Sequence, residues 1–510
     1  MAAVFLACFP ILLILLLLFV GRLSAWKAGL AGVFAAAGLA LFVPYFETPI
    51  GKLYTAAVKG ALTTSLVAYV IFFGILLFHL MNVSGVMQSI ASYIAHSTKD
   101  PIRQVLLLAV GFSPLVESSS GFGIAVIVLA PILISLGFDR FRAVLIALVS
   151  LSAVPWGSLA MGTIIGASLG NIPADKLGTG SALLSLPTFF YFALLIVYLA
   201  GGWSGVKRRF WETLLVSGVC GLSVWGANRY VSVELAGVFG SMAAIGAELL
   251  CIRFTAERAG YEKRAAEAEL SAAKETLPGG ERGSGIAKTF SPYLILITLL
   301  LLSRLIAPVE AFLQSRLVLS LPAYGFSLPL LYSPGFFLGV TCLLTCFLFS
   351  LGKGKVIKSL RSTFVQATPV IGSTLFYVVL SEMMAAASMT DTLAHAAAAL
   401  FGGAFLFVSP LIGGLGGFLT GSNTGSNAMF IKLQTQTAIQ LGISPELVAY
   451  GQNTASSHSM MASPSRVLLG VTVGDVKERE HEMLKKITLI TLGTICLVVL
   501  GLGAIALFSE

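Results

Sequence analysis

Two polar clusters stand inside apolar parts of the sequence, and both contain residue types that bind small ions. The first is Glu117-Ser-Ser-Ser-Gly-Phe-Gly123, and the second, Thr420-Gly-Ser-Asn-Thr-Gly-Ser-Asn427, carries no charge. Glycine and clustered hydroxyl residues break a helix. The free N–H groups and positive dipole end of each exposed helix N-terminus favour an anion. The two clusters therefore predict a binding site for a small anion.

The second cluster has residues suited to both capping and ligand binding. Ser422, Asn423 and Thr424 can cap a half-helix that starts near Ser426 and still leave donors and acceptors free. In the first cluster, glycine lets a ligand approach the backbone closely. Packing of small residues between helices is the alternative interpretation. Eight consecutive small or polar residues without an aliphatic side chain exceed what packing needs.

A third polar cluster follows in residues 451–466, where Asn453, Thr454 and His458 stand in mid-segment and Pro464 adds a second break. Its counterpart in the first half of the chain is residues 150–163, which contain a proline and a glycine at comparable depth. We expect all four regions to enclose one site.

Ionisable residues inside apolar segments are costly and are therefore candidates for function. Glu117 can carry a proton, or it can be a hydrogen-bonded structural residue. His458 can titrate near neutral pH, or be a satisfied interior histidine. Arg466 can pair with a carboxylate, or extend to the cytoplasmic surface. His79 and Glu382, near helix ends, are expected at the membrane interface.

The composition around these residues is that of a membrane protein. Of 510 residues, 57% are hydrophobic and 11% are charged, whereas soluble domains carry about 25% charged residues. The net charge of +9 needs no nucleic-acid partner, because basic residues in short loops orient membrane proteins. The six cysteines show no metal-type spacing, so we predict neither a metal nor a cofactor.

The predicted fold is an all-α polytopic membrane protein with about twelve spanning helices and two broken-helix hairpins. The hairpins cover 104–137 and 402–440, where the first two polar clusters interrupt apolar stretches. The spanning segments are expected near residues 2–20, 27–46, 63–82, 143–167, 183–201, 212–228, 233–252, 290–308, 333–351, 364–384, 444–474 and 487–508.

A charged segment, 253–288, divides the chain and is predicted to be a solvated cytoplasmic linker. It separates a first membrane half, 1–252, from a second, 289–510. A shift of 303 positions superposes the two breaks and aligns two repeat cores, at about 60–167 and 363–474. Placing the basic clusters in the cytoplasm puts an odd number of crossings between equivalent points. The repeats are therefore predicted to be inverted, as in secondary transporters.

The sequence resembles the L-lactate permease family of bacterial secondary transporters over nearly the whole chain. Residues 117–138 resemble its E-G-A-A-G-F-G signature, residues 416–444 its T-G-S-D-T-S-S-N-A-L-F stretch, and residues 453–464 a further motif. Here Asn423 replaces the family's aspartate, and Ser459-Met460-Met461 replaces Gly-Lys-Met. The resemblance implies uptake of L-lactate or a related 2-hydroxymonocarboxylate, such as glycolate, with protons across the bacterial inner membrane.

The expected partners are a small carboxylate, a coupling proton and the lipid bilayer. Sodium-coupled transport of another organic anion is the alternative, since Ser-Asn-Thr at 422–424 also resembles signatures of sodium-coupled dicarboxylate transporters. Glu117 and His458 are the candidate proton carriers. The candidate substrate contacts are Ser119, Ser120, Gly121, Phe122, Gly123, Ser422, Asn423, Thr424, Ser426, Asn427, Asn453, Thr454 and Arg466.

Two other classes of function are weaker alternatives. Ser457 and His458 are the nearest approach to a nucleophile and its base, but adjacent helical residues point about 100° apart and rarely meet. We therefore expect no enzymatic activity. A channel remains possible, and large single-channel currents would reveal it.

Overall fold

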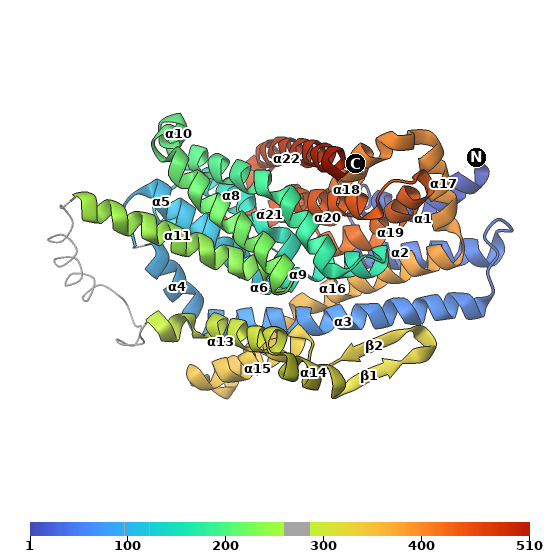
Figure 1. The fold of residues 1–510 in the computed structure, drawn as a ribbon, viewed down its shortest axis with the longest axis horizontal. Helices are drawn as coiled ribbons and strands as arrows, with labels where there is room; N and C mark the ends of the chain where they lie inside the picture. The colour runs from blue at the N-terminus through green and yellow to red at the C-terminus, as the bar shows by residue number, and fades with distance from the viewer. Residues whose placement is uncertain (96, 122, 260–285, 510) are drawn as a thin grey trace.

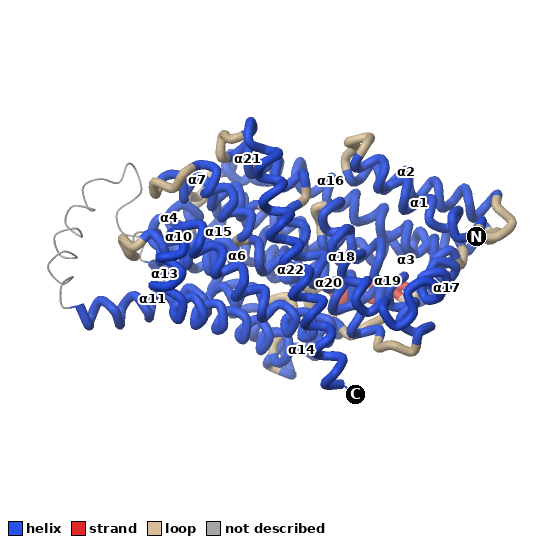
Figure 2. Tube along the Cα trace, turned by 90° about the horizontal axis from the view of Figure 1, so that it is seen from above, coloured by secondary structure: helices blue, strands red, loops and turns tan. Residues whose placement is uncertain are grey.

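The computed structural model describes residues 1–95, 97–121, 123–259 and 286–509. Helices form nearly all of this described chain (Figure 2). The first half contains α1 (Ala2–Phe19), α2 (Ala25–Phe42), α3 (Ile50–Val83), α4 (Val86–Ala95), α5 (Pro101–Val105), the π-helix η1 (Leu106–Phe112), α6 (Ser113–Ser120), α7 (Ile124–Ser135), α8 (Arg140–Val149), the 3-10 helix η2 (Leu151–Trp156), α9 (Gly157–Gly170), α10 (Ala174–Tyr230) and α11 (Ala236–Ala259).

The second half is also mainly helical, and it adds one small β-hairpin. It contains α13 (Ile286–Leu305), α14 (Ala307–Ser315), β1 (Val318–Leu321), η3 (Pro322–Tyr324), β2 (Phe326–Pro329), α15 (Pro334–Leu348), α16 (Lys353–Ala386), α17 (Met389–Phe401), η4 (Gly402–Ala404), α18 (Phe405–Thr420), α19 (Asn423–Leu441), α20 (Pro445–Ser459), η5 (Met460–Ala462), α21 (Pro464–Val473), η6 (Lys477–Arg479) and α22 (Glu480–Ser509). The antiparallel pair β1 and β2 was not predicted.

The chain is an all-α polytopic membrane protein. In the described part, nine helical segments are long and apolar enough to cross a membrane. Large apolar side chains on outer helices remain exposed, such as Phe42 at 83% and Leu507 at 77%, as expected for surfaces that face lipid. Most of the predicted linker at 253–288 lies outside the described residues.

Several predicted segments differ in their bounds from the observed helices. The segments expected at 183–201 and 212–228 are the two arms of α10, which turns at Gly202 with φ of 62°. The segment expected at 143–167 is interrupted, because η2 separates α8 from α9. Helix α15 has 15 residues, fewer than the roughly 20 that a perpendicular span requires.

Equivalent helices in the two halves of the chain begin at a constant offset from each other. Helices α3 and α16 have 34 residues each, and both their first and last residues stand 303 positions apart. Helices α4 and α17 also begin 303 positions apart. Figure 1 shows α5 near the end of the molecule that carries the grey trace, and α17 near the opposite end with the N-terminus. The inverted orientation of the two repeats stays a prediction.

The two long equivalent helices pack against each other along their lengths. A Cβ atom at Gly60 on α3 would lie 2.8 Å from Cα of Val379 on α16, so glycine is required for this close approach. The α3–α16 pair runs beside α19 and α9, which carry parts of the predicted site.

Candidate functional site

Both predicted hairpin tips are breaks between two helices. In the first hairpin, α6 ends at Ser120, and Gly121 and Gly123 have φ of 69° and 75° before α7 begins. In the second, Gly421 has φ of 63°, and Ser422 caps α19 by accepting a hydrogen bond from Gly425 N at 3.1 Å. Only glycine takes up positive φ readily, which explains its place at both tips.

Two further breaks accompany the tips. Before α21, Ser463 caps the helix and accepts from the backbone N–H of Arg466. At the start of α9, Ser158, Leu159 and Ala160 all have positive φ, between 52° and 61°. Non-glycine residues rarely adopt this conformation, and it is often found at functional sites.

Tertiary packing brings the four breaks together. A Cβ atom at Gly121 would lie 2.9 Å from Cβ of Ser158. One at Gly421 would lie 2.9 Å from the hydroxyl of Ser463. One at Gly162, on α9, would lie 2.6 Å from Nδ2 of Asn423. The expectation that the four regions surround one site therefore agrees with the packing, although their role in binding stays a prediction.

Arg466 connects the two hairpin tips. Its guanidinium lies directly against Gly123, and its Nη2 donates to the carbonyl oxygen of Gly421 at 3.4 Å. The residue is 5% exposed, so the alternative that it extends to the surface is wrong. Within the described chain, its Nη1 has no hydrogen-bond partner. A buried guanidinium with a free donor is suited to binding a carboxylate.

Glu117 also contacts Gly123, through its carboxylate. Both of its carboxylate oxygens accept from the Gly123 N–H, at 3.0 and 3.1 Å, and the residue is 2% exposed. Gly123 therefore contacts both the Glu117 carboxylate and the Arg466 guanidinium in a buried site. An external carboxylate that reached Arg466 would come close to the carboxylate of Glu117.

The side-chain amides of Asn423, Asn427 and Asn453 form one wall of the candidate site, which we call the neighbouring wall. Oδ1 of Asn453 accepts from Nδ2 of Asn423 at 3.0 Å and from Nδ2 of Asn427 at 2.8 Å. Nδ2 of Asn453 donates to Thr163 at 3.1 Å and to Ser181 at 2.8 Å. Asn453, on α20, thus joins α19 to α9 and α10, and fixes the orientation of both other amides.

Several buried polar atoms on α6, α19, α20 and α21 have unused hydrogen-bonding capacity. Such groups are uncommon in folded proteins and cost free energy. A polar ligand or water would satisfy them. In the described part of the chain, those without a partner include Ser118 Oγ, Asn423 Oδ1, Thr454 Oγ1, Ser456 Oγ, Ser459 Oγ, His458 Nδ1 and Arg466 Nη1.

Other predicted site residues point elsewhere or make local bonds. Ser119 and Ser120 donate to backbone carbonyls of their own helix. Nε2 of His458 lies 3.1 Å from Oγ1 of Thr188 on α10, a contact that involves neither hairpin tip. Thr424 and Ser426 are buried near the start of α19. Phe122 lies outside the described residues.

The structure also adds residues that the sequence reasoning missed. Ser181, Ser185 and Thr188 share one face of α10, and contact Asn453 and His458. Their spacing of four and three residues indicates that they share one face of a helix, and this pattern is visible in the sequence. Lys432, on α19, was missed as well; its Nζ donates to Oε1 of Glu382 at 3.1 Å.

A separate buried charged cluster lies where α5, α10 and α11 meet. Arg103 donates to Glu212 at 2.7 Å, and Arg209 donates to the same carboxylate at 2.8 Å. Glu212, Glu248 and Cys251 have possible metal-ligand atoms within 4.8 Å of one another. Arg103 Nε is also 3.9 Å from Oε1 of Glu248. Because two cations face these carboxylates, we interpret the cluster as an ion-pair network.

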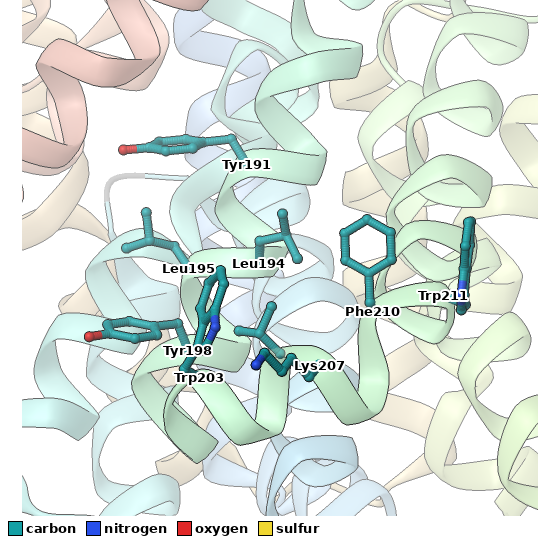
Figure 3. Close-up of a pocket in the computed structure, with 9 residues that line it drawn as sticks. Tyr191, Leu194, Leu195, Tyr198, Trp203, Lys207, Phe210 and Trp211 are labelled. Carbon is teal, nitrogen blue, oxygen red and sulfur yellow. The ribbon is translucent and has the colours of Figure 1, made fainter.

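A pocket of about 650 Å³ is found at the turn of α10, away from the helix breaks (Figure 3). Its aromatic side chains and one lysine are typical of a membrane interface, and we do not assign it to the site. It is lined by Tyr191, Leu194, Leu195, Tyr198, Trp203, Val206, Lys207, Phe210 and Trp211.

Comparison with known proteins is consistent with this architecture. Glycolate permease GlcA of Escherichia coli (strain K12) is 26% identical, over 94% of this chain and 91% of its own length. An L-lactate permease of Streptococcus iniae is 27% identical over 87% and 92%, and one of Bacillus subtilis (strain 168) is 25% identical over 96% and 94%.

A solved structure, that of the Alcanivorax borkumensis YdaH transporter, aligns with 89% of this chain and 87% of its own at 16% identity and a TM-score of 0.47. The family model for L-lactate permease matches residues 3–509. The family match, the named permease relatives and the apolar helices identify a multi-pass plasma-membrane transporter. The chain belongs to the L-lactate permease family.

Proposed function

We propose that this protein takes up L-lactate, glycolate or a related small 2-hydroxymonocarboxylate together with a proton. The observation that carries the proposal is the buried Nη1 of Arg466 near the two hairpin tips, which has no hydrogen-bond partner among the described residues. Relatives named as L-lactate and glycolate permeases support this substrate class. In the proposal, the substrate carboxylate binds Arg466, and its hydroxyl group bonds to free amide and hydroxyl groups of the neighbouring wall.

The position of Glu117 supports the proposed coupling to protons. Two ionised carboxylates in one buried site repel each other, so one of them is favoured to be protonated. When the substrate anion binds beside Arg466, Glu117 takes up a proton, and the loaded site gains no net charge. His458 faces α10 and is the second candidate for the proton carrier. Movement of the hairpin-bearing units then alternates access to the two sides.

Uptake of labelled L-lactate and glycolate into proteoliposomes tests the proposal. An inward proton gradient is expected to drive accumulation, and a protonophore to abolish it. Replacement of sodium by choline is expected to have no effect. Accumulation that needs sodium would favour sodium-coupled transport instead. Uptake indifferent to the proton gradient, or an absence of flux for every 2-hydroxy acid, would refute the proposed mechanism.

A further inference from the structure

A second cluster of charges lies away from the helix breaks, between α3, α16 and α19. Glu382 on α16 accepts a hydrogen bond from Lys432 at 3.1 Å, and Nζ of Lys59 on α3 lies 3.8 Å from its other oxygen. Glu382 is 9% exposed, and its position at the membrane interface stays a prediction. Two lysines therefore share one carboxylate, which leaves an excess of positive charge.

This cluster borders a pocket that opens to the surface. The pocket, of about 360 Å³, is lined by Lys52, Thr55, Lys59 and Glu382 together with small residues of α3 and α16. The pocket lining carries two ammonium groups and one carboxylate, and the same carboxylate also pairs with Lys432. A concave site with an excess of one charge concentrates ions of the opposite sign. The pocket is thus suited to a small anion, and its volume is adequate for a molecule the size of lactate.

The cluster is also connected to the hairpin tip by two helices. Lys432 is seven residues beyond Gly425, so the two lie on one face of α19, about 10.5 Å apart along its axis. Gly425 lies against the ring of Tyr377, which is five residues before Glu382 on α16. The same two helices therefore contact each other at the tip and again at the ion pair.

Tyr377, at the first of these contacts, also carries a polar group. It is 1% exposed, and its hydroxyl has no hydrogen-bond partner within the described chain. An anion that moves from the pocket toward the α19 N-terminus would find a donor there.

We propose that Lys59 and Lys432 form a second binding station for the transported carboxylate, between the pocket and the site at the hairpin tips. In the resting state, Glu382 is paired with both lysines, so that neither lysine can bind the substrate carboxylate. An arriving carboxylate replaces Glu382 on Lys432, and passes next to the hydroxyl of Tyr377. The two ammonium groups of Lys59 and Lys432 favour a small monoanion. That this anion is the transported 2-hydroxymonocarboxylate rests on the proposed function.

Uptake kinetics test the station in the whole protein. Lys432→Gln is expected to raise the KM for glycolate by about tenfold, the loss of one charge contact, with a smaller change in the maximal rate. Glu382→Gln frees both lysines and is expected to lower KM. Lys353→Gln is the matched control, because it removes one exposed charge at the other end of α16, and is expected to leave KM unchanged. An unchanged KM in Lys432→Gln would overturn the proposal.

A labelling experiment tests the same station without any transport. In a variant whose native cysteines are replaced by serine, Thr55→Cys places one thiol in the pocket. A sulfonate-bearing methanethiosulfonate is expected to react faster than a trimethylammonium-bearing one, and adding Lys59→Gln or Lys432→Gln to reduce that preference. Equal rates would refute the station even if uptake proves the proposed function. A preserved preference without any uptake would refute the proposed function alone.

Discussion

Replacement of Arg466 by glutamine separates the structural role of this cation from its role in binding. Arg466 and Glu117 are 5% and 2% exposed, so removal of the cation leaves a buried carboxylate that keeps its backbone hydrogen bond but loses this positive charge. Such a loss costs about 3–5 kcal/mol of folding free energy. The double variant Glu117→Gln/Arg466→Gln removes both charges, and is expected to recover most of that stability. Unfolding of the detergent-solubilised protein, followed by tryptophan fluorescence, measures both changes.

Transport is expected to behave differently from stability. A hydrogen bond to a charged group contributes about 1.5–3 kcal/mol, which corresponds to a KM about tenfold to a hundredfold higher. The double variant therefore regains stability but not substrate affinity, and Arg466→Lys, which keeps the charge but loses the planar fork, is intermediate. Wild-type KM in the stable double variant would refute the assignment of Arg466 to the substrate carboxylate.

Three further predictions concern the surrounding residues. Gly123→Ala is expected to reduce uptake more than tenfold. The φ of 75° disfavours a side chain by about 1–2 kcal/mol, and the new Cβ overlaps the guanidinium of Arg466. Wild-type uptake in this variant would contradict the prediction. Asn453→Asp is expected to raise KM through a negative charge in the anion site, with Asn453→Gln as the uncharged control. Arg103→Met is expected to cost about 1.5–3 kcal/mol of stability, because Glu212 loses a charged hydrogen bond but keeps the one from Arg209. Thermal unfolding measures the loss, and a loss below about 1 kcal/mol would contradict this prediction.

Local features of the fold were predictable from sequence because they depend on short stretches. Apolar runs of sufficient length define membrane helices, and the equal bounds of α3 and α16 follow the predicted offset of 303 positions. The breaks at Gly121 and Gly421 were predicted because glycine interrupts a helix and allows positive φ. The break at the start of α9 was less clear, because Ser158, Leu159 and Ala160 do not favour the backbone that they adopt.

The composition of the candidate site was only partly predictable. The polar residues of α19 and α20 were identified, because polar side chains are conspicuous in apolar segments. Ser181, Ser185 and Thr188 were missed, since spaced hydroxyl residues are common in membrane helices. No local pattern indicates that Lys432 pairs with Glu382, because the two residues are on different helices.

The amino-acid sequence by itself determined most of the apolar helices and the breaks at Gly121 and Gly421, and that uncharged polar groups and one acid lie at these breaks. Helix length, glycine conformation and capping are short-range properties, so they are visible in the order of residues. Only the tertiary structure decided that Arg466 reaches both Gly123 and Gly421 instead of the surface. It also decided that Asn453 orients the amides of α19. Such pairings depend on how distant helices pack, and that packing is selected by the whole buried surface.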